Sequence, residues 1–357
     1  MIFVDGLPFS LNSSSSSSSS SKSQPSDLLV ALMEHQVLVS ATHSFKSIQE
    51  RKVSASMDSK LITSSNSSRY VYLFQREYAT VDPSLVHYVG TDEATTCVGV
   101  VIRNRKNGMT SVSHMDSPKI VDIGFYQMLA LVVDHNLDAG LDVHLVGAFE
   151  DVSPNHASGR SISQGKRDGY SIPLCRKIVE TMQKRPEKFH VKTLCVLRHN
   201  TKYDSQGNAL PIFNGLLVET SSGTLIPASF DKTSRCPDEI VRRLRVSSSH
   251  EDPSWQGKLL DTYDTKTDRF IIAPCSWTKR LVQIVLSLQS LSDSEILASC
   301  STSPLAEGPE FVDNERSWRY KKVIMPGNWL RHGWFGLRTV FYIQVNEFIL
   351  SEILDLR

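Results

Sequence analysis

Short β-rich segments recur along the chain from Tyr70 onward, and they limit the possible folds more than any other feature. Each segment has five to eight residues rich in Val, Ile, Leu and aromatic side chains, and polar or glycine-containing stretches separate them. This pattern predicts strands at residues 70–74, 98–103, 110–114, 142–149, 191–197, 212–219, 258–264 and 269–273.

A few helical patterns lie between these strands. The clearest begins at Ser117, which can cap a helix, and Pro118 suits the first helical position. Many strands joined by hairpins, with few helices between them, favour an α+β domain. Helices are predicted at residues 117–136, 172–184, 237–245, 277–291 and 309–321.

The segment before this region has a different composition. Residues 1–9 contain one short strand candidate, and residues 13–21 are nine consecutive serines. A serine tract cannot bury enough apolar surface to offset its ordering entropy. We therefore expect residues 10–69 to be a Ser-rich flexible linker with one helix, at about residues 26–38.

Charge and cysteine usage exclude several classes of protein. Lys and Arg number 39 against 38 Asp and Glu, a net charge of +1, which argues against nucleic acid or an anionic membrane as partner. The six cysteines lie at least 20 residues apart, so neither a zinc knuckle nor a disulfide scaffold is expected. No apolar run is long enough for a transmembrane helix, and the N-terminus lacks the basic region of a secretory signal. We expect reduced thiols, a cytoplasmic or nuclear location and no bound metal.

The segment at residues 90–118 carries the sharpest chemical signal. Cys97 follows a run of small and polar residues at the start of a predicted strand, and His114 follows 17 positions later. Between them, Asn107-Gly108 is typical of a hairpin turn. Residues 98–103 and 109–114 are therefore predicted to pair.

The hairpin register decides whether Cys97 and His114 can meet. An even-length loop places His114 and Asp116 on the face of Cys97. Centred on residues 105 and 106, it sets Cys97 directly opposite His114, with Cβ atoms about 5 Å apart. Centred one residue later, it makes them diagonal neighbours at about 7–8 Å. An odd-length loop would separate them onto opposite faces.

A cysteine beside a histidine can perform nucleophilic catalysis. The thiolate attacks, while the histidine lowers the thiol pKa and protonates the leaving group. A third group usually orients the ring. Candidates in the same region are Thr91, Thr95, Thr96 and Asp116.

The chain resembles the protein N-terminal asparagine amidohydrolases in their plant form. The resemblance covers most of residues 70–320 and the first residues of the chain. The matching stretches are MIFVDG at the start, VYLFQREYATVDP from residue 71, GTDEATTC from 90, VHLVGAF from 143, ASFD from 228, DTYDTKTDRFIIAPCSWT from 261 and STSPLAEGPEFVDNERSWRY from 301.

The resemblance implies both a fold and a reaction. The fold would be two stacked, mostly antiparallel β-sheets flanked by helices, like the chemoreceptor deamidases and cytotoxic necrotising factors. The reaction would hydrolyse the side-chain amide of an N-terminal asparagine to aspartate with release of ammonia. By similarity, Cys97, His114 and Thr91 would form the catalytic trio, and no cofactor would be needed.

Further expectations follow for the substrate. Backbone N–H groups near residues 96–98 would bind the oxyanion, and a carboxylate would bind the free α-ammonium. Candidates for that carboxylate are Asp92, Glu93, Asp116 and Asp5. The resemblance implies substrates with N-terminal asparagine and a product that feeds arginylation and N-degron proteolysis. We expect a monomer.

Two alternatives remain open at this stage. The chain could be another cysteine-dependent protein deamidase, acting on glutamine, or a non-catalytic adaptor on the same fold. The amidohydrolase domain is predicted at residues 70–320. Residues 321–357 depart from the family pattern and are predicted to be a divergent C-terminal tail.

Overall fold

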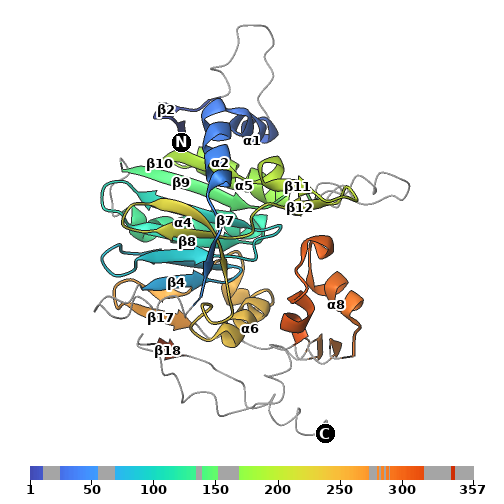
Figure 1. Ribbon diagram of the computed structural model, residues 1–357. Coiled ribbons are helices and arrows are strands. Elements are labelled where there is room, and N and C mark those ends of the chain that lie inside the picture. The colour runs from blue at the N-terminus through green and yellow to red at the C-terminus, as the bar shows by residue number, and fades with distance from the viewer. Residues whose placement is uncertain are drawn as a thin grey trace.

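The computed structural model describes residues 1–10, 25–54, 69–133, 139–151, 169–272, 280, 283–284, 287–288, 290–316 and 339–341. These residues form two stacked β-sheets with helices on both outer sides (Figure 1). The α+β class and the layered arrangement expected from the sequence are confirmed. Both sheets contain parallel as well as antiparallel pairs, so they are more mixed than expected.

The larger sheet has eight strands in the order β15-β5-β8-β7-β9-β10-β1-β2. The β7–β8 hairpin lies near its centre, and β7 also pairs antiparallel with β9. These strands are β1 (Ile2–Val4), β2 (Leu7–Pro8), β5 (Glu77–Val81), β7 (Val98–Asn104), β8 (Thr110–Met115), β9 (Gly140–Gly147), β10 (Lys188–Cys195) and β15 (Leu260–Asp261).

The smaller sheet has five strands in the order β3-β14-β13-β6-β4. Two further strand groups lie beside the main sheets, the β11–β12 hairpin and the group β16-β17-β18. The strands are β3 (Arg51–Val53), β4 (Tyr70–Leu73), β6 (Tyr88–Thr91), β11 (Thr201–Tyr203), β12 (Ala209–Pro211), β13 (Leu216–Glu219), β14 (Thr224–Phe230), β16 (Tyr263–Asp264), β17 (Arg269–Ile272) and β18 (Thr339–Phe341).

The layers are held together by alternating side chains of the strands. Val101 and Val112 of the larger sheet pack on Leu73 and Leu216 of the smaller one. The opposite face of the larger sheet packs on helices α1 (Pro25–Glu34), α4 (Val121–Val132) and α5 (Ser171–Lys184). Helix α6 (Glu239–Ser249) covers the outer face of the smaller sheet. In Figure 1, α8 (Asp293–Cys300) lies apart from the sheets.

The segment predicted as a linker with one helix differs from that expectation. In its described part, residues 25–54, two helices occur, α1 and α2 (Gln36–Ser47), followed by β3, which pairs with β14. Leu32 and Leu38 are completely buried, because the helices present apolar residues on one side to the sheet. The serine-rich composition around these helices obscured that pattern. Residues 11–24 lie outside the described part, as does the tail at 321–357 except for β18.

Other predicted elements within the described residues agree with the structure to within a few residues, whereas most of the helix predicted at 277–291 and residues 317–321 of the one predicted at 309–321 lie outside the described part. Ser117 accepts a hydrogen bond from the backbone N–H of Lys119, and a 3-10 turn at Pro118–Ile120 leads into α4. The helix at 172–184 is α5, and the one at 237–245 is α6. Besides α2 and β3, the sequence reading missed β2, β5, β6, β11, β12, β14 and α8.

A buried ion-pair cluster fixes the edge of the sheets beside the β7–β8 hairpin. The fully buried carboxylate of Glu77 bonds to Arg242 at 2.5 Å and to Arg245 at 2.7 Å, which ties α6 to the start of β5. One residue earlier, the Arg76 N–H donates to the carbonyl of His114 at 2.8 Å. The cluster therefore holds the turn that supports His114.

Candidate active site

Cys97 lies directly before β7, at the end of a loop anchored on both sides. The Ala148 N–H donates to the Cys97 carbonyl at 2.7 Å, and the Ala94 N–H donates to the Asn214 carbonyl at 2.8 Å. Gly147 has φ +114°, and a Cβ there would lie 2.6 Å from the Cys97 carbonyl oxygen. Only glycine therefore allows β9 to approach this closely. The Cys97 side chain remains partly exposed.

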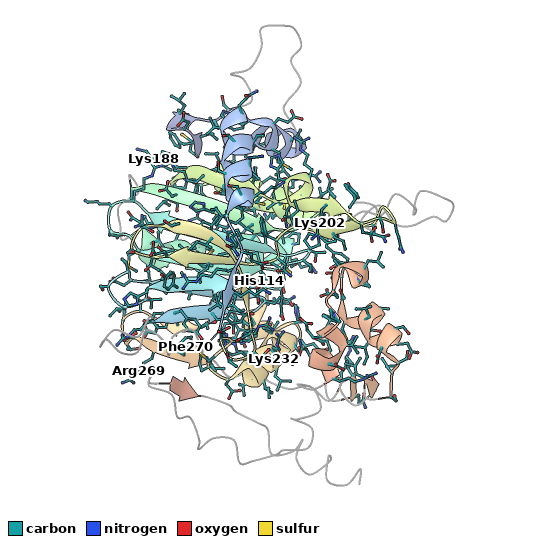
Figure 2. The ribbon with its side chains drawn as sticks, in the orientation of Figure 1. His114, Lys188, Lys202, Lys232, Arg269 and Phe270 are labelled. Atoms are coloured by element: carbon teal, nitrogen blue, oxygen red, sulfur yellow. The ribbon has the colours of Figure 1, made fainter. Side chains whose placement is uncertain are left out.

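The hairpin loop has an even length, which is the alternative that places Cys97 and His114 on the same face. Gly99 pairs with His114 and Val98 with Met115, so extending the ladder by one residue places Cys97 opposite Asp116. The loop is thus centred on Lys106 and Asn107, and His114 is a diagonal neighbour of Cys97. Figure 2 shows His114 near the centre of the molecule, whereas labelled residues such as Lys188 and Lys202 lie at its periphery.

Cys97 and His114 share the face that looks toward the smaller sheet. Gly99, two residues after Cys97, has its missing side chain directed at Leu216 of β13. Val112, two residues before His114, belongs to the core between the sheets. Side chains alternate along a strand, so Cys97 and His114 both project into this interior.

Thr91 defines the state of the His114 ring. Its hydroxyl donates to the Leu73 carbonyl at 2.8 Å and lies 2.8 Å from His114 Nδ1. A hydroxyl has a single proton, so Thr91 accepts from Nδ1–H. The neutral ring therefore carries its proton on Nδ1 and leaves a lone pair on Nε2. That Nε2 is buried without a hydrogen-bond partner in the described part of the chain.

The resting pair is neutral. Burial, against the opposing charges of Asp116 and Glu93, lowers the pKa of His114 to about 4, so the ring is uncharged at neutral pH. Burial and the charges of Asp116 and Glu307 raise the pKa of the Cys97 thiol. The expectation of a low-pKa Cys97 is therefore wrong for the resting protein, because a neutral imidazole supplies no positive charge and the nearby charges are negative.

Backbone donors are available around the thiol. In the described residues, no group accepts a hydrogen bond from the backbone N–H of Thr96 or Cys97. The Thr96 hydroxyl lies 2.6 Å from the Thr302 hydroxyl and also hydrogen-bonds to the Cys97 thiol. This geometry can accommodate an oxyanion beside the sulfur.

Asp92 is occupied by structural contacts. Its carboxylate accepts from the Tyr72 hydroxyl at 2.6 Å, the Phe230 N–H at 2.7 Å and Arg235 at 3.2 Å. Burial, opposed by Arg235 and assisted by Glu93, raises its pKa to about 6. These contacts stabilise the loop before Cys97, and they occupy the carboxylate that a substrate ammonium would need.

Glu93 is likewise held by cations. It pairs with Arg235 at 2.6 Å and with Arg243 at 3.0 Å. Burial would raise its pKa, but Arg243 and Arg235 outweigh burial and lower it to about 2.

Asp116 and Asp5 occupy very different places. The Asp116 side chain is 3% exposed, and its Oδ1 has no partner among the described residues. Asp5 is exposed in the β1–β2 turn. Strand β1 is three strands from β7, about 14 Å at ordinary strand spacing. The structure therefore brings Asp116 to Cys97 and leaves Asp5 outside the site.

The sequence reading missed a second side of the site, formed by residues 301–307. Thr302 contacts Thr96, and the charge of Glu307 acts on the Cys97 thiol. These residues belong to one of the family-like stretches, which was the available signal. Nothing in their local pattern indicated chemistry, because they lie about 200 residues from Cys97 in sequence.

Two other properties concern metals and membranes. Within the described residues, no three His, Cys, Asp or Glu side chains gather closely enough to hold a metal ion. The same residues contain no helix with the length and apolar character needed to span a bilayer.

Comparison with known proteins identifies the family. The family model described as protein N-terminal asparagine amidohydrolase matches residues 60–324. The chain is 62% identical over 321 residues to the protein N-terminal asparagine amidohydrolase of Arabidopsis thaliana, covering 90% of this chain and 91% of that protein. It is 32% identical over 270 residues to the mouse protein of the same name, covering 72% and 78%, and 31% identical over 256 residues to the human one, covering 69% and 72%. The chain therefore belongs to the protein N-terminal asparagine amidohydrolase family.

Proposed function

We propose that this chain hydrolyses the side-chain amide of an N-terminal asparagine to aspartate and releases ammonia, with Cys97 as nucleophile. The observation that carries the proposal is the free Nε2 of His114. Thr91 holds the proton on Nδ1, so Nε2 can accept the thiol proton. Family membership supports the choice of reaction.

Attack would form a tetrahedral intermediate. The Cys97 sulfur bonds to the amide carbon while its proton passes to Nε2 of His114. The carbonyl oxygen becomes an oxyanion, and the backbone N–H groups of Thr96 and Cys97 are its nearest candidate donors. His114, neutral at rest, is in the protonation state that this step needs.

Collapse and hydrolysis would complete the cycle. The C–N bond breaks as Nε2–H protonates the leaving group, which departs as ammonia and leaves a thioester on Cys97. Water then gives a proton to Nε2 and attacks the thioester carbon. The C–S bond breaks, the proton returns to sulfur, and aspartate is released.

The proposed biological setting follows from the product. Substrates would be peptides and proteins with N-terminal asparagine, and the aspartate formed would feed arginylation and N-degron proteolysis. We propose action as a monomer in the cytoplasm or nucleus.

Ammonia release from an asparagine-initiated peptide tests the proposal. We expect turnover by the native chain and none by Cys97→Ala. Turnover should fall strongly with an N-terminal glutamine peptide, because one extra methylene displaces the amide carbon and a displacement of about 1 Å can cost about 100-fold in rate. Equal turnover of glutamine peptides would favour the general deamidase alternative, and no turnover of either peptide would favour the adaptor.

A further inference from the structure

We propose that Asp116 and Glu307 together bind the α-ammonium group of the substrate and that the bound ammonium activates Cys97, an inference that rests on the proposed function. Two carboxylates from distant parts of the chain act electrostatically on one thiol, and both belong to segments that contact Cys97 or its loop. Among the described residues, one of them has an acceptor atom without a partner, and neither forms an ion pair with Lys or Arg.

Asp116 supplies the first half of this ammonium site. It lies opposite Cys97 in the extended β7–β8 register. Its Oδ2 accepts from Gln75 at 3.2 Å and lies 3.9 Å from His250 Nε2. Its Oδ1 is buried without a partner. Leaving a buried acceptor unpaired is costly, so Oδ1 is suited to a donor that arrives with the substrate.

Glu307 supplies the second half from a distant segment of the chain. It directly follows the 3-10 turn Pro304–Ala306, in a segment joined to the Cys97 loop by the bond between the Thr96 and Thr302 hydroxyls. The Ser301 hydroxyl donates to Glu307 at 2.5 Å, which orients its carboxylate. Its charge reaches the Cys97 thiol.

No resident cation neutralises these two carboxylates. Among the described residues, no Lys or Arg forms an ion pair with Asp116 or Glu307. Arg235 and Arg243 are engaged by Asp92, Glu93 and Glu239.

Arg76 is linked to Asp116 through His250. Arg76 bonds His250 Nδ1 at 2.6 Å, and since Arg can only donate, that nitrogen must be the acceptor. His250, whose pKa is lowered by burial, therefore faces Asp116 as a neutral ring. The largest charge effects on Glu307 come from two further carboxylates, Glu93 and Glu315.

Charge compensation would couple binding to catalysis. In the free protein, burial and these two charges keep the Cys97 thiol protonated. An α-ammonium between them would offset both charges, so the thiol would lose its proton to neutral His114 more readily. An acetylated peptide lacks the positive charge. It would therefore lose the rate of the chemical step as well as binding.

Alkylation of Cys97 by iodoacetamide tests this idea independently of turnover. Only the thiolate reacts, so the rate at fixed neutral pH reports the thiol pKa of the free protein. We expect Asp116→Asn and Glu307→Gln each to raise this rate, up to about tenfold for one pKa unit. Both variants should also lower kcat/KM for the free-amine asparagine peptide. The alkylation rate is measured over a pH series, because a lowered thiol pKa shifts the profile to lower pH, whereas a local opening that only exposes Cys97 raises the rate at every pH.

Two matched control variants make the same carboxylate-to-amide change at residues outside the proposed site. Asp5→Asn and Glu310→Gln remove exposed carboxylates and should leave both rates unchanged. Mass spectrometry would assign the alkylated cysteine, and thermal melts would establish that each variant is folded. Glu307 is only partly buried, so Glu307→Gln decides the question if Asp116→Asn does not fold.

The outcomes separate this inference from the proposed function. Native turnover of asparagine peptides with unchanged alkylation in both folded variants would overturn the inference alone. Equal loss of activity on free and acetylated peptides would also overturn it. No native turnover, with faster alkylation in the variants, would overturn the proposed function while leaving the two charges established at Cys97.

Discussion

Thr91 accepts a hydrogen bond from Nδ1 of His114 across 2.8 Å, and this contact joins the two sheets at the candidate active site. The same hydroxyl donates to the Leu73 carbonyl, so its proton is already committed. The result is a ring with one defined tautomer and an unpaired Nε2 beside Cys97. An orientation of this kind is what a general base requires.

Removing the Thr91 hydroxyl should impair the base. Thr91→Val preserves the side-chain shape but offers no acceptor to Nδ1–H, so the ring loses its fixed tautomer. We expect kcat to fall about 10- to 100-fold, less than the roughly 100- to 10,000-fold contribution of a general base, because His114 itself remains. Thr91→Ser should restore most of the activity. A Thr91→Val protein with native kcat would contradict this role.

Cys97→Ala should abolish ammonia release with little change in stability. The side chain lies at a strand entrance and is partly exposed, so its loss leaves only a small cavity and a destabilisation of about 1 kcal/mol or less. Cys300→Ala is a matched control, because Cys300 is also partly exposed and has no proposed role. Residual turnover by Cys97→Ala above the uncatalysed rate would rule out the thioester route.

Activity should persist into mildly acidic solution. His114 must be unprotonated at Nε2 to accept the thiol proton, and its pKa in the folded protein is about 4. We therefore expect no limb near the ordinary histidine pKa of about 6.5, and the acidic limb of kcat/KM should lie below it, where Glu307, whose pKa is raised by burial, loses its charge and where His114 becomes protonated. A pH series on the native protein measures this. A limb near pH 6.5 would show that a different group controls the reaction.

The same pKa predicts a pH dependence of stability. The unfolded chain binds a proton at His114 near pH 6.5, whereas the folded chain does so only near pH 4. The free energy of unfolding contributed by this group is therefore fully present above about pH 6.5 and decreases as the pH falls toward 4. By pH 5 the loss is about 2 kcal/mol.

Urea unfolding at neutral pH and at about pH 5 would measure this loss. The His114→Gln protein should lose about 2 kcal/mol less than the native chain over that interval. Buried His144, whose pKa is also about 4, remains in both proteins and cancels in the comparison. An identical pH dependence in the two proteins would contradict the assignment.

Asp92→Asn should damage stability and leave the recognition of the amine intact. Asp92 accepts three hydrogen bonds, one of them from Arg235, and a charge-assisted bond contributes about 1.5–3 kcal/mol. We expect a loss of about 2 kcal/mol in the free energy of unfolding. The ratio of kcat/KM for free and acetylated peptides should remain native. If a folded Asp92→Asn protein no longer preferred the free peptide over the acetylated one, Asp92 would have to be part of the ammonium site.

Local sequence predicted the hairpin more reliably than its surroundings. Asn107-Gly108 marked the turn, and parity placed His114 and Asp116 on the face of Cys97. The choice between a direct and a diagonal pairing required the loop geometry. Helices α1 and α2 were underestimated because burial of Leu32 and Leu38 depends on a sheet built by later residues.

The protonation of Cys97 was the clearest failure of local reasoning. A cysteine near a histidine suggests a thiolate, but burial leaves His114 neutral and places Asp116 and Glu307 beside the sulfur. Glu307 lies far away in sequence, and a pairwise motif says nothing about the burial of its members. The pKa depends on every charge within range.

Sequence alone left open whether the loop length is even or odd, and therefore whether Cys97 and His114 share a face, but it did predict the α+β class, the β7–β8 hairpin and the family. These depend on strand alternation, turn chemistry and local similarity, which are properties of neighbouring residues. The three-dimensional arrangement was needed to show which acidic residues pair with arginines, that Asp116 Oδ1 has no partner among the described residues, and that the charge of Glu307 acts on the thiol. Electrostatic energies depend on distance and burial in three dimensions, and those are settled only when the two sheets and the segment at 301–307 come together.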